Sequence, residues 1–182
     1  MELRHDDFHA VPLTTALAEL DYAAYMASPD VIRIHSDGRW PVDGFTLDQD
    51  LAQLAGHEDD HRAGRAYTFA LLDPAHTTSL CCLYLNPVRE RLRGCFPAGA
   101  PMVTFWIRQD RQDLATTVAR AVHEWLLTAW PFPSHVFRIL PGEHASRVAL
   151  AGLGLRERVL SPALEPRPYL WFQPDDVRVE CT

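Results

Sequence analysis

A long helix-like segment lies between two short apolar runs, and this arrangement limits the folds open to the chain. The apolar runs are residues 102–108 and 136–140, and the segment between them, about 113–130, carries one apolar stripe at helical spacing. Parallel neighbours in a sheet need a long crossover connection, which is usually a helix. The sequence therefore predicts an α/β fold in which this helix joins a parallel pair of strands.

The segments that precede this unit predict antiparallel strands and a further helix. Residues 66–72 and 79–85 are rich in strand-forming residues, and Asp73-Pro74-Ala75-His76 between them is typical of a hairpin turn. Thr46 and Gln49 have the spacing of a capping box, which starts a helix that ends near Gly64. The residues of this helix that we expect to face inward are Leu47, Leu51, Leu54 and Ala55.

The expected fold is a single-domain mixed sheet, mostly antiparallel, with helices on both faces. Its parallel strand pair is expected to splay at one end, and the order of elements is β-α-α-β-β-β-α-β-α-β-β. No linker interrupts residues 1–182, so we expect one domain. Residues 89–101, rich in arginine, glycine and proline, are expected to form an irregular loop, and residues 174–182 a C-terminal tail.

The composition excludes several classes of function. The formal net charge is −7, whereas a surface for nucleic acid or anionic membrane needs a basic face. No stretch approaches the about 20 apolar residues of a membrane span, and the first residues lack the pattern of a signal peptide. All 17 basic residues are arginine, so no lysine can form a Schiff base. We expect a cytoplasmic protein that binds neither nucleic acid nor membrane.

The segment His57-Glu58-Asp59-Asp60-His61 matches the His-Glu-x-x-His pattern of zinc proteases. Histidines four residues apart share one face of a helix and could hold zinc, with Glu58 as the base. The helix of a zinc protease is buried, however, and two buried aspartates would be costly charges. The four cysteines also lack the paired spacing of a zinc site. We therefore expect a solvated helix face and no metal.

Five short segments stand out along the chain: Phe105-Trp106-Ile107-Arg108, Glu124-Trp125-Leu126, Trp40-Pro41, Cys82-Leu83-Tyr84 and Gly154-Leu155. Together with the order of elements, they resemble a bacterial branch of the GNAT superfamily of N-acetyltransferases, and the resemblance covers nearly the whole chain. It implies a fold in which acetyl-CoA lies where the parallel strands separate, with its pyrophosphate on the turn that opens the following helix.

The resemblance implies a cofactor site at the end of strand 102–108 and in the turn 109–115. This turn departs from the family pattern because it contains no glycine and carries Asp110 and Asp113. Carboxylates at a helix N-terminus can cap its N–H groups, which competes with a pyrophosphate. The residues that would bind acetyl-CoA are Trp106, Ile107, Arg108, Arg111, Gln112, Asp113 and Leu114.

Acyl transfer to an amine needs a base, donors for the oxyanion and an acid for the thiolate. The candidates for acid and base are Tyr84, Glu143 and His144, and Trp40 is the candidate wall of a substrate pocket. The resemblance thus implies an acyl-CoA-dependent N-acetyltransferase that acts on a small-molecule amine. The alternative is a GNAT-fold binding or sensing module that does not use acetyl-CoA. Assembly into a homodimer stays open.

Overall fold

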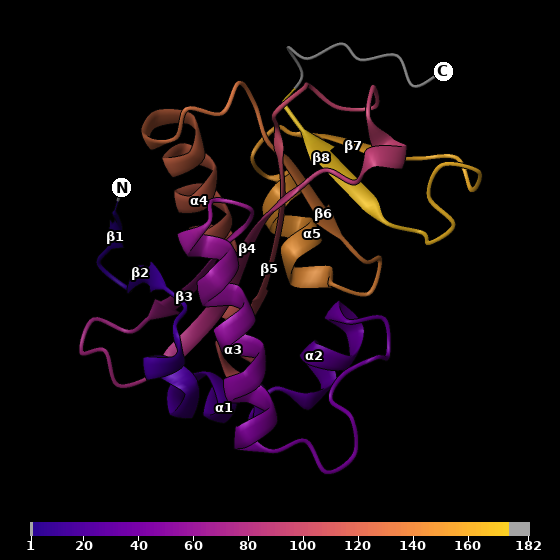
Figure 1. Cartoon of the computed structure of the whole chain (residues 1–182). Helices are drawn as coiled ribbons and strands as arrows, with labels where there is room; N and C mark the ends of the chain where they lie inside the picture. Colours follow the sequence, from indigo (N-terminus) through magenta and orange to yellow (C-terminus); the bar gives the residue numbers. More distant parts are fainter. Residues whose placement is uncertain (1, 175–182) are drawn as a thin grey trace. The chain divides into compact units, whose positions relative to one another are not determined.

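The structure is a computed structural model that describes residues 2–174. These residues contain an eight-stranded mixed sheet of order β1-β2-β3-β4-β5-β6-β8-β7 (Figure 1). The α/β class and the mixed, mostly antiparallel sheet are confirmed. The strands are β1 (Leu3–His5), β2 (Phe8–Pro12), β3 (Tyr67–Leu72), β4 (Ser79–Pro87), β5 (Pro101–Ile107), β6 (Val136–Ile139), β7 (Arg156–Val159) and β8 (Leu170–Gln173).

The contacts divide the chain into two compact units. The N-terminal unit comprises residues 2–85 and 105–112, and the C-terminal unit comprises residues 86–104 and the described part of 113–182. Each unit is described below by itself. No helix in the described part of the chain is both long and apolar enough to cross a membrane.

In the N-terminal unit, β1 to β4 form an antiparallel run. The predicted hairpin is confirmed, since β3 pairs with β4 and the Asp73 carboxylate accepts hydrogen bonds from the N–H groups of Thr77 and Thr78, both at 2.7 Å. The short strand β1, which pairs with β2, was not predicted. The helices are the 3-10 turn η1 (Thr15–Leu17), α1 (Ala18–Met26), α2 (Pro29–His35) and α3 (Leu47–Arg62).

The pair Ser28-Pro29 is typical of the end of a helix, because proline disfavours helical backbone at the residue before it. Helix α1 does end just before this pair, at Met26, but Pro29 is also the first residue of α2. Proline suits this position because its fixed φ matches the helix and its missing N–H is not needed there. The same two residues therefore end one helix and begin the next.

The predicted start of α3 is confirmed, but of its four predicted inward residues only Leu54 is buried. Thr46 and Gln49 form the capping box. Leu47 and Leu51 are 36 % and 41 % exposed, and Ala55 is exposed. The helix packs against α1 and β3 through a face offset from Leu47 and Leu51, because the buried and half-buried positions follow the spacing i, i+4, i+7 and i+11. This face carries Asp50, Leu54, His57 and His61.

In the C-terminal unit, β5 and β6 run parallel, with Met102 opposite Val136 and Val103 opposite Phe137. The predicted parallel pair is confirmed, while its splay stays a prediction. The crossover helix is α4 (Ala115–Ala129), which packs against α5 (His144–Ala151). The apolar stripe of α4 is buried as predicted, at Val118, Val122, Trp125 and Leu126.

The expected irregular loop contributes to the core of the C-terminal unit. It contains one 3-10 turn, η2 (Glu90–Leu92), and its residues Leu92 and Phe96 are buried against Trp171 of β8. Prolines and glycines predict irregular backbone, but they do not show that the apolar residues between them are buried. Most of the expected C-terminal tail, residues 175–182, lies outside the described residues.

Candidate active site

Tyr84 and Trp106, which were both predicted as site residues, are hydrogen-bonded to each other in the N-terminal unit. The indole Nε1 of Trp106 on β5 donates to the hydroxyl of Tyr84 on β4 over 3.2 Å. Burial raises the pKa of Tyr84 well above its usual value, and the neighbouring Cys82 and Asp21 raise it further. The phenol is therefore neutral at pH 7. Its oxygen accepts the hydrogen bond from Trp106, and a hydrogen bond with the Cys82 side chain further favours its protonated form.

Two buried carboxyl groups lie in the same unit, on α1 and α3. Asp21 is 6 % exposed and Asp50 is 3 % exposed. Within residues 2–174, Oδ1 of Asp21 and Oδ2 of Asp50 are enclosed and make no hydrogen bond. Burial, and then the charge of Asp50, raise the pKa of Asp21 to about 7, and burial raises the pKa of Asp50 to about 6. A carboxyl group with a pKa near 7 can accept or release a proton at neutral pH.

Sequence reasoning missed both aspartates. Asp21 lies in the first turn of α1 and Asp50 in the first turn of α3, where acidic residues usually interact favourably with the helix dipole at the surface. One available signal was the helical spacing of Asp50 with Leu54, which places both on the face that α3 buries. Asp21 also raises the pKa of Tyr84, so its charge lies near the phenol.

His57 adds an imidazole to this group of residues. Its Nδ1 lies 3.3 Å from the hydroxyl of Thr68, and its ring centroid lies 5.8 Å from that of Tyr84. Burial lowers the pKa of His57, so the ring is mostly neutral at pH 7. The ring of His35 on α2 stacks on Tyr84 at 6.3 Å. Tyr84 therefore lies beside the rings of both His35 and His57.

Trp40, the predicted substrate wall, belongs to an aromatic group beside these residues. Its ring packs edge-on against Phe45 at a centroid distance of 5.4 Å. Phe45 in turn contacts Tyr25 at 5.1 Å, and Tyr25 contacts Trp106 at 6.2 Å. The structure thus brings Trp40, Tyr84 and Trp106 into one cluster of the N-terminal unit.

The end of β5 presents a backbone donor at the edge away from β4. The N–H of Arg108 donates to the carbonyl of Leu80 on β4 over 2.8 Å. Successive N–H groups of a strand point to opposite edges, so the N–H of Ile107 points away from β4. The side-chain amide of Gln112 lies at that outer edge, where it donates to the carbonyl of Ile107 over 2.6 Å. Of the two residues predicted to hold the acyl group, Ile107 has the suitable orientation and Trp106 does not.

The turn after β5 differs from the predicted self-capped helix start. The turn is a 3-10 segment, η3 (Gln109–Leu114), and the N-cap of α4 is Leu114, with no side-chain capping bond among the described residues. Asp110 pairs instead with Arg108 through two hydrogen bonds of 2.9 Å, which lower the pKa of its carboxyl group. The prediction that Asp110 caps the helix is therefore wrong.

These contacts bear on whether the residues fit acetyl-CoA. The Ile107 N–H at the outer edge of β5 is a suitable donor for a thioester carbonyl. The Arg108–Asp110 ion pair offsets part of the negative charge that the turn would direct at a pyrophosphate. The residues of the N-terminal unit therefore fit an acyl-CoA, although the turn lacks the glycines that allow close approach of phosphate.

Glu143 and His144 lie in the C-terminal unit, at the start of α5. The Glu143 carboxylate accepts a hydrogen bond from the N–H of Leu140, which closes the turn after β6. His144 is exposed. The catalytic roles of these two residues stay predictions, as do the cofactor contacts of Arg111, Asp113 and Leu114.

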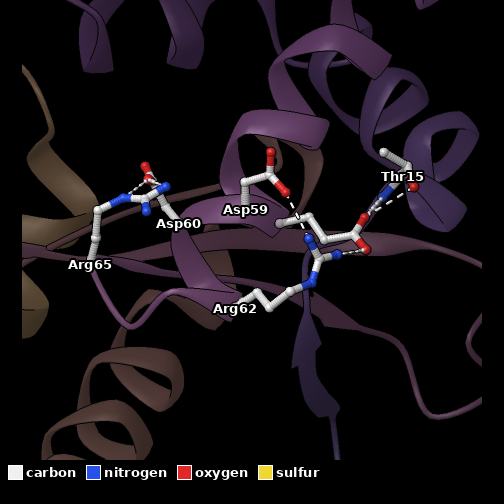
Figure 2. Close-up of polar contacts among 6 residues, drawn as sticks. Thr15, Asp59, Asp60, Arg62 and Arg65 are labelled. Carbon is white, nitrogen blue, oxygen red and sulfur yellow. Dashed lines mark hydrogen bonds and ion pairs between the residues drawn. The ribbon is translucent and has the colours of Figure 1, made fainter.

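The acidic residues of the His-Glu-x-x-His segment are engaged in hydrogen bonds and ion pairs (Figure 2). Glu58 accepts from the N–H and hydroxyl of Thr15 over 3.1 and 3.0 Å and pairs with Arg62. Asp59 pairs with Arg62, and Asp60 with Arg65, each at 2.7 Å. These bonds leave Glu58 poorly placed to act as the base of a zinc protease.

The two histidines of this segment pack on the sheet and do not lie on a solvated face as expected. His61 contacts the rings of Tyr67 and Phe69 on β3, at centroid distances of 5.1 and 5.2 Å. In the described part of the chain, no group of three or more histidine, cysteine, aspartate or glutamate residues is placed to hold a metal ion.

Comparison with known proteins gives matches only among solved structures. No protein-family model matches the sequence, and a search of curated proteins found no match. The structure of ribosomal-protein-S5-alanine acetyltransferase from Vibrio fischeri matches with a TM-score of 0.72 and 15 % identity, over 97 % of this chain and 98 % of that one. Mycobacterium smegmatis RimJ in complex with a CoA disulfide matches with a TM-score of 0.71 and 18 % identity, over 92 % and 81 %.

A third structure is that of the microcin C7 self-immunity acetyltransferase MccE, in complex with acetyl-CoA and AMP. It matches with a TM-score of 0.70 and 12 % identity, over 93 % of each chain. At these identities the matches show a shared fold. They extend over nearly the whole of each chain, so the likeness is not confined to one motif.

Proposed function

We propose that this chain, which has the fold of the GNAT acetyltransferases, transfers an acetyl group from acetyl-CoA to an amine. The observation that carries the proposal is the Tyr84 phenol, which is neutral and hydrogen-bonded to Trp106, in the same unit as the buried Asp21, whose pKa is about 7 and whose charge acts on the phenol. An amine is protonated at neutral pH and must lose a proton before it attacks a carbonyl carbon. Such attack also needs hydrogen-bond donors that stabilise negative charge on the carbonyl oxygen.

Each of these needs has a candidate in the N-terminal unit. Asp21 is the proposed acceptor of the ammonium proton, because its raised pKa matches a general base at neutral pH. The Ile107 N–H is the proposed donor to the acyl oxygen. Tyr84 is the proposed proton donor, since its phenol is neutral at pH 7 and Trp106 donates to its oxygen. Acetyl-CoA itself supplies an activated thioester.

The acceptor is proposed to enter along the aromatic group of Trp40, Phe45 and Tyr25. Aromatic faces attract ammonium groups, and the buried carboxyl groups of Asp21 and Asp50 add negative charge. Among the matched structures, one protein is named for the alanine of a ribosomal protein and another for the serine. A test therefore includes peptides with N-terminal alanine or serine beside small amines.

The experiment measures release of free thiol from acetyl-CoA by the full chain, with a panel of such peptides and amines at pH 8. We expect Tyr84→Phe and Asp21→Asn each to lower kcat by about 100-fold or more, the usual contribution of a general acid or base. Tyr67→Phe is the matched control, because it removes a phenol of the same unit that has no role in the proposed reaction. Loss of rate in Tyr67→Phe equal to that in Tyr84→Phe would count against the assignment.

A calorimetric titration of CoA into the wild type separates the proposal from the alternative binding module. We expect saturable binding with one CoA per chain. If CoA does not bind and no acceptor releases thiol, the chain is a GNAT-fold protein that does not use this cofactor, as the alternative holds.

A further inference from the structure

One guanidinium group of the C-terminal unit is largely buried and donates no hydrogen bond. It belongs to Arg138 in the middle of β6, between the buried residues Phe137 and Ile139. Within residues 2–174 its side chain forms no hydrogen bond, and its Nη1 is enclosed without a partner. Buried polar groups in folded proteins almost always have a hydrogen-bond partner. Arg138 therefore lacks an acceptor that a ligand can supply.

The flat face of the Arg138 guanidinium stacks on the ring of Tyr169. The Cζ of Arg138 lies 4.3 Å from the ring centroid, a cation–π contact. Arg167 donates from Nη1 to the hydroxyl of the same tyrosine over 3.3 Å. Stacking uses the face of a guanidinium, whereas its N–H donors point outward in its plane. The contact therefore orients Arg138 and leaves its donors for an acceptor at its edge.

The carboxylates near Arg138 bind other partners. Glu165, whose side chain is 2 % exposed, pairs with Arg91 over 2.7 Å. Glu143 accepts from the N–H of Leu140. These two acids stabilise the charge of Arg138 from a distance, but burial has the larger effect and lowers its pKa. Among residues 2–174, Arg138 thus has no direct counter-ion.

A second arginine adds positive charge beside the first. Arg89 is exposed, and its side chain forms neither a hydrogen bond nor an ion pair with any other described residue. Its charge acts on Arg138 in the direction that disfavours protonation, so the two groups lie near each other. An anion bound between them would relieve this repulsion and supply the missing acceptor.

We propose that Arg138, with Arg89 beside it, binds an oxyanion, a carboxylate or phosphate group carried by a ligand. Arginine matches both groups because two parallel N–H donors meet two oxygens. Tyr169 keeps the guanidinium in a fixed orientation before the ligand arrives. The proposal rests on the C-terminal unit alone and does not depend on acetyl transfer.

The test measures the melting temperature of the full chain at constant ionic strength, with sodium phosphate or sodium succinate exchanged for sodium chloride. A ligand that binds the native state raises the melting temperature in a saturable way. We expect phosphate or succinate to do so in the wild type. We expect the apparent affinity to fall by about tenfold in Arg138→Gln, the scale of a lost charge-assisted hydrogen bond, and to be unchanged in the matched control Arg120→Gln on the exposed face of α4.

The two anions distinguish the source of the oxyanion. A response to phosphate alone assigns a phosphate-bearing ligand, and a response to succinate alone assigns a carboxylate. If Arg138→Gln does not fold, Arg89→Gln provides the test, because Arg89 is exposed and its replacement should not disturb folding. We expect Arg89→Gln to weaken binding of the anion about twofold or more. The proposal is overturned if neither anion exceeds chloride, or if every foldable variant binds as the wild type does.

Discussion

The buried Asp21 predicts that a single neutralising substitution stabilises the protein at high pH. The structure raises the pKa of Asp21 from 3.8 to about 7. The folded state therefore retains a proton that the unfolded chain loses above about pH 4. The contribution of Asp21 to stability is most favourable below pH 4, falls as the pH rises toward 7, and stays reduced above that value. One pKa unit corresponds to about 1.36 kcal/mol, so the full cost of the ionised carboxylate is about 4 kcal/mol.

Asp21→Asn removes this cost and keeps the shape of the side chain. The new amide brings buried N–H donors that lack acceptors, which costs about 1–3 kcal/mol. We therefore expect Asp21→Asn to be about 1–3 kcal/mol more stable than the wild type at pH 8, and less stable than the wild type at pH 4.5. Urea denaturation at both pH values measures the difference.

Asp48→Asn is the matched control, because Asp48 lies exposed in the first turn of α3, close in sequence to the buried Asp50. Its effect on the free energy of unfolding should be nearly the same at both pH values. The reasoning is refuted if the difference between Asp21→Asn and the wild type does not change between pH 4.5 and pH 8. Since the same variant is expected to lose acetylation activity, it would also show a trade-off between stability and function.

Three further predictions follow from the capping box, the turn after β5 and the segment around Glu58. Thr46→Ala should lower the free energy of unfolding by about 1 kcal/mol in urea denaturation, whereas Thr46→Ser should leave it nearly unchanged. Asp110→Asn should tighten CoA binding by about two- to fivefold in calorimetric titration, because it removes a negative charge near a helix start and releases Arg108. Asp110→Glu, which keeps the charge, is the control. Unchanged CoA affinity in Asp110→Asn would contradict the prediction. Elemental analysis should find no stoichiometric zinc, and one tightly held zinc per chain would reverse the interpretation of Glu58 as a partner of Thr15.

The features that were predicted correctly are those in which local and long-range preferences agree. The stripe of α4 is apolar at every position that it buries, so periodicity was enough to identify both the helix and its crossover. The capping box of Thr46 and the turn at Asp73 are also local, because the side chain bonds the backbone within a few residues. Such signals can be read without knowledge of the partner elements.

The errors arose where packing partners override the local pattern. The face of α3 that carries Asp50 and His57 contacts α1 and β3, whereas Leu47 and Leu51, which were predicted to face inward, are exposed. Arg138 was overlooked for a similar reason, since one polar residue in a strand of apolar residues is usually exposed. Tyr84 and Trp106 were singled out through the family resemblance, but their hydrogen bond joins strands β4 and β5 and could not be inferred from either strand alone.

The alternation along β5 makes this strand intolerant of changes in length. The N–H of Arg108 holds the strand to β4, and that of Ile107 points to the other edge. Deleting or inserting one residue before Ile107 would exchange these roles, so the outward donor would turn toward β4 and the bond to Leu80 would be lost. An insertion or deletion within residues 73–78 of the β3–β4 hairpin would not reverse the direction of these N–H groups. Natural variation in length is therefore expected in that loop and not in β5.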